Sequence, residues 1–136
     1  VEATTRKDTT QIQPMVSAED LLLAQSMVLQ VPVAPHVIRK ALRLARSTRV
    51  SEGGCPDFVQ KYVRWGAGPR ASQALILAAK ARAVLRGETF AGVEDVKAIA
   101  PPVMRHRILT NFNAESDGIT TDDIIQKLLE HTREKE

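Results

Sequence analysis

A long alanine-rich segment in the middle of the chain, residues 70–86, constrains the fold more than any other feature. Its apolar side chains recur at helical spacing, and Gly87 follows where a left-handed residue commonly ends a helix. We therefore predict a helix over 70–86. Small alanine side chains favour close packing of one helix on another. The predicted inward positions are Ala71, Ala74, Leu75, Ala78, Ala81 and Leu85.

The composition supports a helical core. Apolar residues make up 43% of the 136 residues but aromatic residues only 4%, so Leu, Ile, Val and Ala must fill the interior. This length suits one compact domain. The single cysteine, Cys55, excludes an internal disulfide and a multi-cysteine metal site. No segment approaches about 18 consecutive apolar residues and no signal peptide opens the chain, so we expect a cytoplasmic protein without membrane contact.

Capping residues, prolines and apolar periodicity predict the other helices. These helices cover 18–29, a stretch from Pro35 that ends before Gly53, 58–65, a stretch after Gly92 that kinks or restarts at Pro101 and Pro102, and a stretch capped by Thr120 or Thr121. In the helix over 18–29 the expected periodic positions are Leu21, Leu22, Gln25, Val28 and Leu29. In the helix from Pro35, an apolar stripe of Val37, Ile38, Ala41, Leu42 and Ala45 should oppose Arg39, Lys40, Arg43 and Arg46.

These elements predict a mostly α fold, a small bundle of five to six helices with at most a minimal two-stranded ladder. The candidate strands are 90–91 and 107–109, which could pair with each other. Residues 1–13 are polar and lack helical periodicity, so we interpret them as a flexible tail or the remnant of a linker. Residues 14–136 then form the helical domain.

The net charge of +3 conceals a basic middle of the chain. Residues 36–107 hold 14 Lys and Arg against 5 Asp and Glu, a balance of +9, whereas the two flanks are acidic. Such a segment can face nucleic acid, a bound nucleotide or an acidic partner subunit. The charge alone does not choose among these.

The run from Gly66 to Arg70 is the strongest local signal for a site. Gly66 and Gly68 allow a tight backbone bend, and Pro69 fixes φ just as the helix begins. Arg70 is thereby placed in the first turn, where free amides and the helix dipole favour an anion and a guanidinium can clamp a phosphate. The local pattern alone also fits a helix start with a solvated arginine.

Several ordered motifs resemble MoxR-type AAA+ ATPases over roughly residues 14–130. The run 59–72 resembles the sensor-2 segment of that family, in which a Gly-Ala-Ser-Pro-Arg-Ala-type run opens the lid helix. Gly68 stands where the family commonly has Ser, and Trp65 where Tyr is frequent, but Pro69 and Arg70 are kept. The resemblance continues through 17–22, 31–34, 75–83, 90–96 and 102–108.

This resemblance implies a C-terminal helical lid that closes over ATP bound to a neighbouring α/β core. Arg70 would be the sensor-2 arginine that reaches the γ-phosphate, with Gly66, Gly68 and Pro69 shaping the turn. The implied partners are the protein's own AAA+ core, neighbouring subunits of a hexameric ring, and von Willebrand factor A-domain proteins. The implied role is that of a chaperone-like ATPase.

The sequence contains no Gly-x-x-x-x-Gly-Lys-Ser/Thr run and no apolar strand ending in Asp-Glu. We therefore expect the phosphate-binding loop and the Mg²⁺ ligands to lie in a core N-terminal to Val1. The parent protein is expected to be an ATPase, whereas the chain alone should neither hydrolyse ATP nor bind it tightly.

Other polar residues have simpler interpretations. His36, His106 and His131 lack metal-ligand spacing, which favours packing or surface hydrogen bonds. Asp122 and Asp123 adjoin a helix start, where carboxylates complement the dipole. The alternative function is an autonomous basic helical module that binds nucleic acid. With so few aromatic residues to stack on bases, a solvated or intersubunit face is favoured for the basic helical stretch of Arg39, Lys40, Arg43, Arg46 and Arg49.

Overall fold

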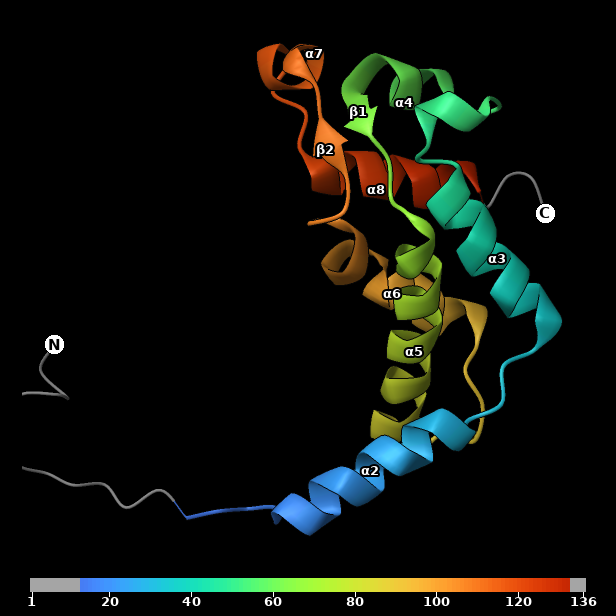
Figure 1. Ribbon diagram of the computed structural model, residues 1–136, viewed down its shortest axis with the longest axis vertical. Helices are drawn as coiled ribbons and strands as arrows, with labels where there is room; N and C mark the ends of the chain where they lie inside the picture. Colours follow the sequence, from blue (N-terminus) through green and yellow to red (C-terminus); the bar gives the residue numbers. More distant parts are fainter. Residues whose placement is uncertain (1–12, 133–136) are drawn as a thin grey trace, which may run out of the picture.

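The computed structural model describes residues 13–132, and Figure 1 shows them as a curved bundle of helices. The predicted class, a mostly α domain with a minimal ladder, is confirmed. The described residues form seven α-helices, one more than the upper prediction because of the short helix α7. The tail predicted over 1–13 lies outside this range except for Gln13. The elements are α2 (Ala18–Gln30), α3 (Pro35–Arg46), the 3₁₀ turn η1 (Val50–Glu52), α4 (Asp57–Tyr62), β1 (Val63–Trp65), α5 (Pro69–Leu85), α6 (Val93–Met104), β2 (Leu109–Thr110), α7 (Phe112–Ser116) and α8 (Thr121–His131).

Helix α5 runs through the middle of the bundle and packs against α2, α3 and α6 (Figure 1). Four of its residues, spaced four apart, are fully buried: Ala71, Leu75, Ala79 and Ala83. Three of the four are alanines, which lets neighbouring backbones come close. Leu85 does not face inward as predicted, because it lies about 200° around the helix from Ala83 and is 87% exposed.

Helix α3 buries Val37, Ala41 and Ala45 as predicted, but the buried face is rotated to one side of the predicted stripe. Ile38 and Leu42 point outward, whereas Leu44 and the basic residue Lys40 point inward. The Lys40 ammonium donates a 2.6 Å hydrogen bond to the backbone carbonyl of Thr132, just beyond α8. This long-range acceptor compensates for burial of the charge, so a lysine can occupy a position that its residue type would place outside. The buried set is Val37, Lys40, Ala41, Leu44 and Ala45.

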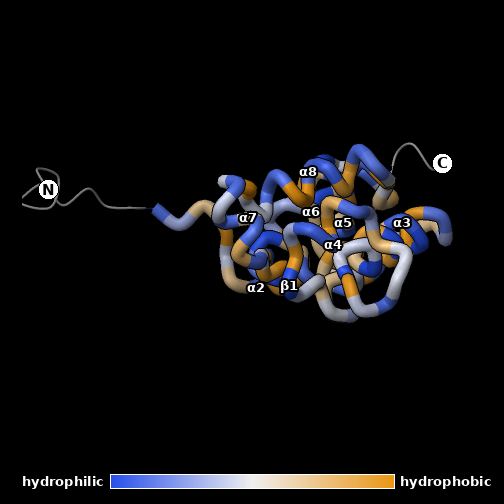
Figure 2. The backbone as a smooth tube through the Cα atoms, turned by 90° about the horizontal axis from the view of Figure 1, so that it is seen from above, coloured by the Kyte–Doolittle hydropathy of each residue, from blue (hydrophilic) through white to orange (hydrophobic). Residues whose placement is uncertain are grey.

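Helix α6 continues through Pro101 and Pro102 without restarting and ends at Met104. Both prolines lie near its C-terminal end, and the N–H of Arg105 closes the last turn on the Pro101 carbonyl at 3.0 Å. Helix α8 packs on α6 and begins after Thr120, which is one of the two predicted caps. Apolar and polar positions alternate along these helices (Figure 2).

Asp95 ties the start of α6 to the end of α5. Its carboxylate accepts from the Gly92 N–H at 2.9 Å and pairs with the guanidinium groups of Arg82 and Arg86. Burial alone would raise the pKa of Asp95, but these three donors hold that pKa below its ordinary value of 3.8. The ionised form is therefore the one that stabilises the fold.

We expect Asp95→Asn to lower the free energy of unfolding by about 2 kcal/mol at pH 7, measured by urea denaturation. This is less than for a fully buried pair, because Arg82 and Arg86 are partly exposed. Since the pKa is depressed in the folded state, this stabilisation is present above the ordinary pKa and is lost as the pH falls through the folded value. The difference between wild type and variant should therefore shrink at pH 3.

The neighbouring Glu94 offers a matched control for this substitution. Its exposed carboxylate pairs with Lys97 at 2.7 Å within the same helix turn. Glu94→Gln removes the same charge and should change the free energy of unfolding by about 0.5 kcal/mol or less. Equal losses from the two substitutions would show that the Asp95 contacts do not stabilise the fold.

The two-stranded ladder includes Leu109 from the candidate strand over 107–109, but its other strand is not the one predicted. The helix predicted over 58–65 ends at Tyr62, and β1 then pairs antiparallel with β2, with Val63 opposite Thr110. The candidate strand at 90–91 does not pair with 107–109. Instead, the Ala91 N–H donates to the Pro32 carbonyl at 3.2 Å, and Ala91 forms an isolated parallel bridge with Val33. Both partners are distant in the sequence, so local patterns could not identify them.

Helix α2 lies at one end of the bundle and buries none of its residues (Figure 1). Val28 is half-buried, but the other predicted apolar positions are exposed. Lys80 of α5 anchors the helix by donating to the Leu29 carbonyl at 3.0 Å. No described element covers the exposed apolar side chains of α2. Those at least 50% exposed are Leu21, Leu22, Leu23, Met27 and Leu29.

Candidate functional site

The bend that precedes α5 is held against the end of α3. Gly66 lies so close to Thr48 that a Cβ atom at position 66 would overlap the Thr48 carbonyl oxygen and stand 2.8 Å from the Arg49 nitrogen. The Ala67 N–H donates to the Thr48 hydroxyl at 2.8 Å, and this hydroxyl donates to the Ala45 carbonyl at 2.7 Å. Thr48 and Ala67 are fully buried. The bend is therefore fixed by backbone contact and not by the glycines alone.

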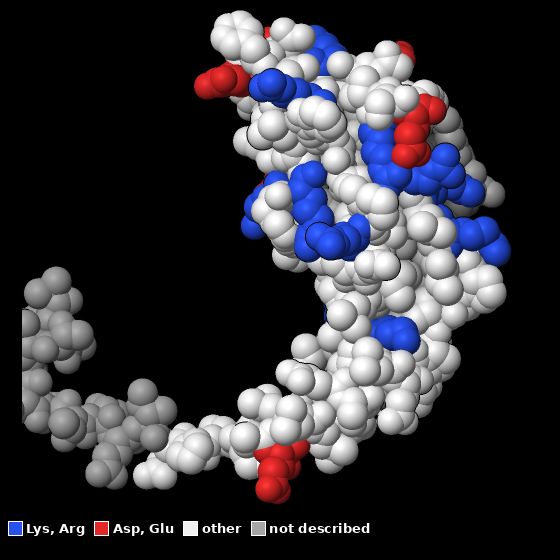
Figure 3. Space-filling model, in the orientation of Figure 1, with Lys and Arg blue, Asp and Glu red and all other residues white. Residues whose placement is uncertain are grey.

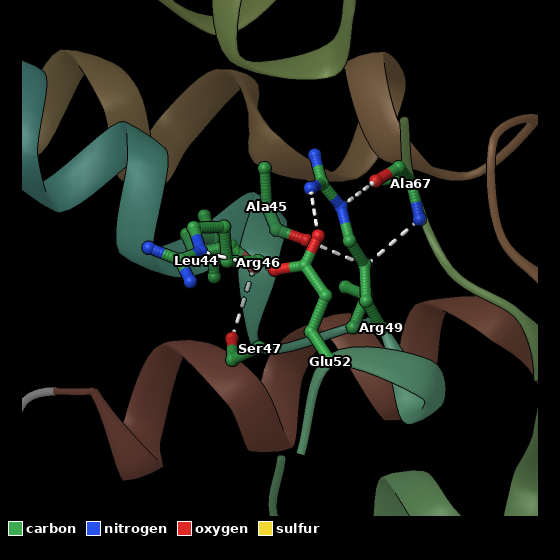
Figure 4. Close-up of polar contacts among 8 residues, drawn as sticks. Leu44, Ala45, Arg46, Ser47, Arg49, Glu52 and Ala67 are labelled. Atoms are coloured by element: carbon green, nitrogen blue, oxygen red, sulfur yellow. Dashed lines mark hydrogen bonds and ion pairs between the residues drawn. The ribbon is translucent and has the colours of Figure 1, made fainter. Parts of the chain in front are cut away.

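Arg49 fixes the same bend from its other side (Figure 4). Its Nε donates to the Ala67 carbonyl at 2.8 Å, and its Nη1 lies 2.5 Å from the Glu52 carboxylate. Glu52 also accepts from Arg46 Nε at 3.1 Å. Hydrogen bonds from Arg49 and then Arg46 lower the pKa of Glu52, so its carboxylate stays ionised and holds Arg49 in place. Thr48, Arg49 and Glu52 together form what we call the bend clamp.

Arg70 is the second residue of α5, directly after Pro69. Its side chain is exposed and makes no hydrogen bond or ion pair with any residue in the described range. The N-cap residue, Gly68, supplies no side-chain oxygen to the free amides of the first turn. Both the guanidinium and the helix start are therefore open to an outside anion.

A groove of about 540 Å³ lies beside the bend. Trp65 forms part of it and is 68% exposed, which is unusual for a large aromatic side chain. Arg64, whose guanidinium is exposed, also lines the groove. The lining residues are Arg49, Val50, Ser51, Glu52, Arg64, Trp65, Gly66, Ala67, Gly68 and Pro69.

The structure brings the predicted residues Gly66, Gly68, Pro69 and Arg70 together at the start of α5. The bend clamp was not predicted, because Thr48 and Arg49 meet Ala67 across a long stretch of chain. Arg49 had been grouped only with the basic residues of the preceding helix. A weak signal existed in the sequence, since a glycine at position 66 suggests close approach by another backbone.

The other polar candidates have structural roles or lie on the surface. His131 packs edge-on against Phe58, with ring centroids 6.4 Å apart, and His36 and His106 are exposed. Asp122 pairs with Arg105 at 2.8 Å, and Asp123 accepts from the Thr120 N–H at 2.8 Å. Within residues 13–132 no three His, Cys, Asp or Glu side chains are arranged to hold a metal ion. In the same range no helix has the length and hydropathy needed to cross a bilayer.

Comparison with known proteins defines the class to which this fold and bend belong. The sequence profile of the AAA lid domain matches residues 57–128, a stretch that runs from α4 into α8 and includes Arg70. The chain belongs to the AAA lid domain family.

Longer relatives narrow this class to lid domains of the MoxR type. The chain is 31% identical to Chaperone MoxR1 of Mycobacterium tuberculosis, over 88% of this chain and 32% of MoxR1. It is 25% identical to the uncharacterized protein YeaC of Bacillus subtilis, over 87% of this chain and 34% of YeaC. The crystal structure of a proposed ATPase from Cytophaga hutchinsonii matches 94% of this chain and 39% of its own, with a TM-score of 0.84 and 28% identity. The domain is a lid of the MoxR type, and it spans about a third of the length of these curated relatives.

Proposed function

We propose that this lid senses ATP bound to the AAA+ core of the same protein, and that Arg70 contacts the γ-phosphate. The observation that supports the proposal most directly is the state of Arg70. It is an exposed guanidinium without a partner in the described residues, at the open start of a helix whose preceding bend is clamped. An arginine that only solubilised the surface would not need this rigid support.

The residues present at the bend fit a phosphate. The N-terminus of a helix attracts anions through its free amides and dipole, and a guanidinium adds a planar pair of donors. ATP would supply the phosphate and Mg²⁺ would be held by the core, where we also place the phosphate-binding loop. The chain's own residues bind and orient: Arg70 carries the charge, Pro69 sets the direction of the helix, and Thr48 and Arg49 fix its start.

The proposal has a second part, which is direct contact between the lid and the AAA+ core. Helix α2 supports this part. The exposed leucines of α2 form an apolar surface that a partner in the same protein would cover. With α2 docked on the core and Arg70 on the nucleotide, the lid would move as one body when the γ-phosphate is lost. The bend clamp would transmit a displacement of Arg70 to α3 and to the rest of the bundle.

The proposal extends to the assembly. Relatives of this type include one named as a chaperone. We therefore place the lid in a hexameric, chaperone-like ATPase ring in the cytoplasm, with von Willebrand factor A-domain proteins as candidate partners. No observation favours the nucleic-acid module that the basic middle of the chain had left open as an alternative.

Hydrogen exchange of the full-length protein and of the isolated chain tests the proposal. In the full-length protein, amides 66–72 should exchange more slowly with a non-hydrolysable ATP analogue than with ADP. Amides of α2 should be protected by the core with either nucleotide. In the isolated chain neither nucleotide should change exchange at 66–72. Equal exchange at 66–72 with the analogue and with ADP in the full-length protein would show that the bend does not sense the γ-phosphate.

A further inference from the structure

A second hollow lies on the outer face of α3 and shares Glu52 with the groove beside the bend. It measures about 420 Å³ and is closed on one side by the loop that follows η1. Gly53 and Gly54 both have φ of +72°, a conformation open mainly to glycine, and this conformation lets the loop bend along one side of the hollow. The lining residues are Arg39, Leu42, Arg43, Arg46, Ser47, Glu52, Gly53 and Gly54.

Three arginines dominate the charge of this hollow. Arg39, Arg43 and Arg46 follow one another at spacings of four and three, which places them on one face of α3. The space-filling view shows Lys and Arg gathered over α3, with an acidic group beside them (Figure 3). Lys40 does not belong to this surface, because its side chain points into the core.

Within residues 13–132, two of the three arginines have no acidic side chain to neutralise them. Arg46 shares the Glu52 carboxylate with Arg49. The guanidinium groups of Arg39 and Arg43 are exposed and contact no hydrogen-bond or ion-pair partner in residues 13–132. The hollow therefore carries two available cations, separated by one turn of helix or about 6 Å along its axis.

The hollow is not uniformly polar. Leu42 lies between the two arginines and remains 44% exposed. Arginine is enriched in protein–protein interfaces, and burial of an exposed apolar side chain such as Leu42 by a partner would be favourable. A free inorganic anion would not bury the Leu42 side chain.

The same residues argue against nucleic acid as the occupant. No aromatic side chain lines the hollow, so bases would find nothing on which to stack. An acidic peptide can instead place a carboxylate at each arginine and an apolar side chain between them.

We propose that this hollow binds an acidic segment of a partner protein, with two carboxylates on Arg39 and Arg43 and an apolar side chain on Leu42. Glutamates at positions i and i+4 of a helix are also about 6 Å apart along its axis, so a short acidic helix lying along α3 matches both arginines. Planar guanidinium groups suit carboxylates in bidentate geometry. This docking surface does not depend on ATP or on Arg70.

The test measures the fluorescence anisotropy of two labelled peptides added to the 136-residue chain. One is a 15-residue alanine-based helix with Glu at i and i+4 and Leu between them, and the other has Gln in place of Glu. The Glu peptide should bind, and binding should weaken at least about tenfold with the Gln peptide or with the double variant Arg39→Glu/Arg43→Glu. Lys127→Glu on α8 makes a charge change of the same kind elsewhere and should alter the affinity less than about twofold.

Four further measurements test the proposal. Circular dichroism checks that the double variant is folded, and amide NMR shifts of the wild-type chain should move at Gly53 and Gly54 when the Glu peptide is added. Equal binding of the Glu and Gln peptides, or equal loss with Lys127→Glu, would overturn the proposal. Tighter binding of a duplex DNA would assign the hollow to nucleic acid. Dimers of the wild-type chain that Arg43→Glu dissolves would assign it to a second copy.

Discussion

Replacing Arg70 with alanine in the full-length protein is expected to lower kcat for ATP hydrolysis at least about tenfold. The physical reason is the loss of a positive charge aimed at the phosphoryl group on which negative charge shifts during transfer. Preorganised donors of this kind contribute roughly 10²-fold or more where they have been removed from other enzymes. Steady-state hydrolysis measured over a range of ATP concentrations would separate the loss in kcat from any change in KM.

Two variants sharpen the interpretation of Arg70→Ala. Arg70→Lys keeps a charge but loses the planar pair of donors, so it should recover only part of the rate. Lys127→Ala removes an exposed cation from α8 and should leave hydrolysis unchanged. Because Arg70 is exposed and makes no described contact, neither substitution there should change the stability of the isolated chain. Wild-type turnover by Arg70→Ala would remove the sensing role from this residue.

The sequence predicts the part of the site that consists of consecutive residues. A glycine–proline bend, a helix start and an arginine in its first turn all lie within 66–70, and the structure places each of them as expected. The long helix behind them was predictable for the same reason, since its alanines follow a local period. The role of Arg70 as a γ-phosphate sensor stays a prediction.

The features that the sequence did not predict depend on contacts between distant segments. The Thr48 hydroxyl and the Arg49 guanidinium bind the backbone N–H and carbonyl of Ala67, which carry no residue-specific pattern. Lys40 can be buried because the Thr132 carbonyl at the end of α8 accepts a hydrogen bond from its ammonium. The exposure of α2 could not be predicted for a related reason. Apolar periodicity indicates that one face of a helix will be buried. It does not indicate whether the segment that buries this face belongs to this chain.

The bend clamp leads to the largest expected effect on stability, at Gly66. Gly66→Ala should lower the free energy of unfolding by about 3 kcal/mol, because the added Cβ would overlap the Thr48 carbonyl oxygen. Both atoms in conflict belong to the backbone or are bonded to it, so no side-chain rotation can relieve the overlap. The chain must separate α3 from the bend and strain the hydrogen bonds that join Thr48 and Arg49 to Ala67. Urea denaturation of the isolated chain measures the loss.

Gly68, at the other end of the same bend, provides the matched control. A Cβ at position 68 would meet no atom within 4 Å, and its φ of −73° is accessible to any residue. Gly68→Ser also adds a hydroxyl at the N-cap of α5, so the stability should stay within about 0.5 kcal/mol of wild type or rise slightly. In the full-length protein Gly66→Ala should also lower ATP turnover, since Arg70 would lose its fixed direction, whereas Gly68→Ser should not. If both substitutions are tolerated equally, the close approach of the bend to Thr48 does not hold the start of α5.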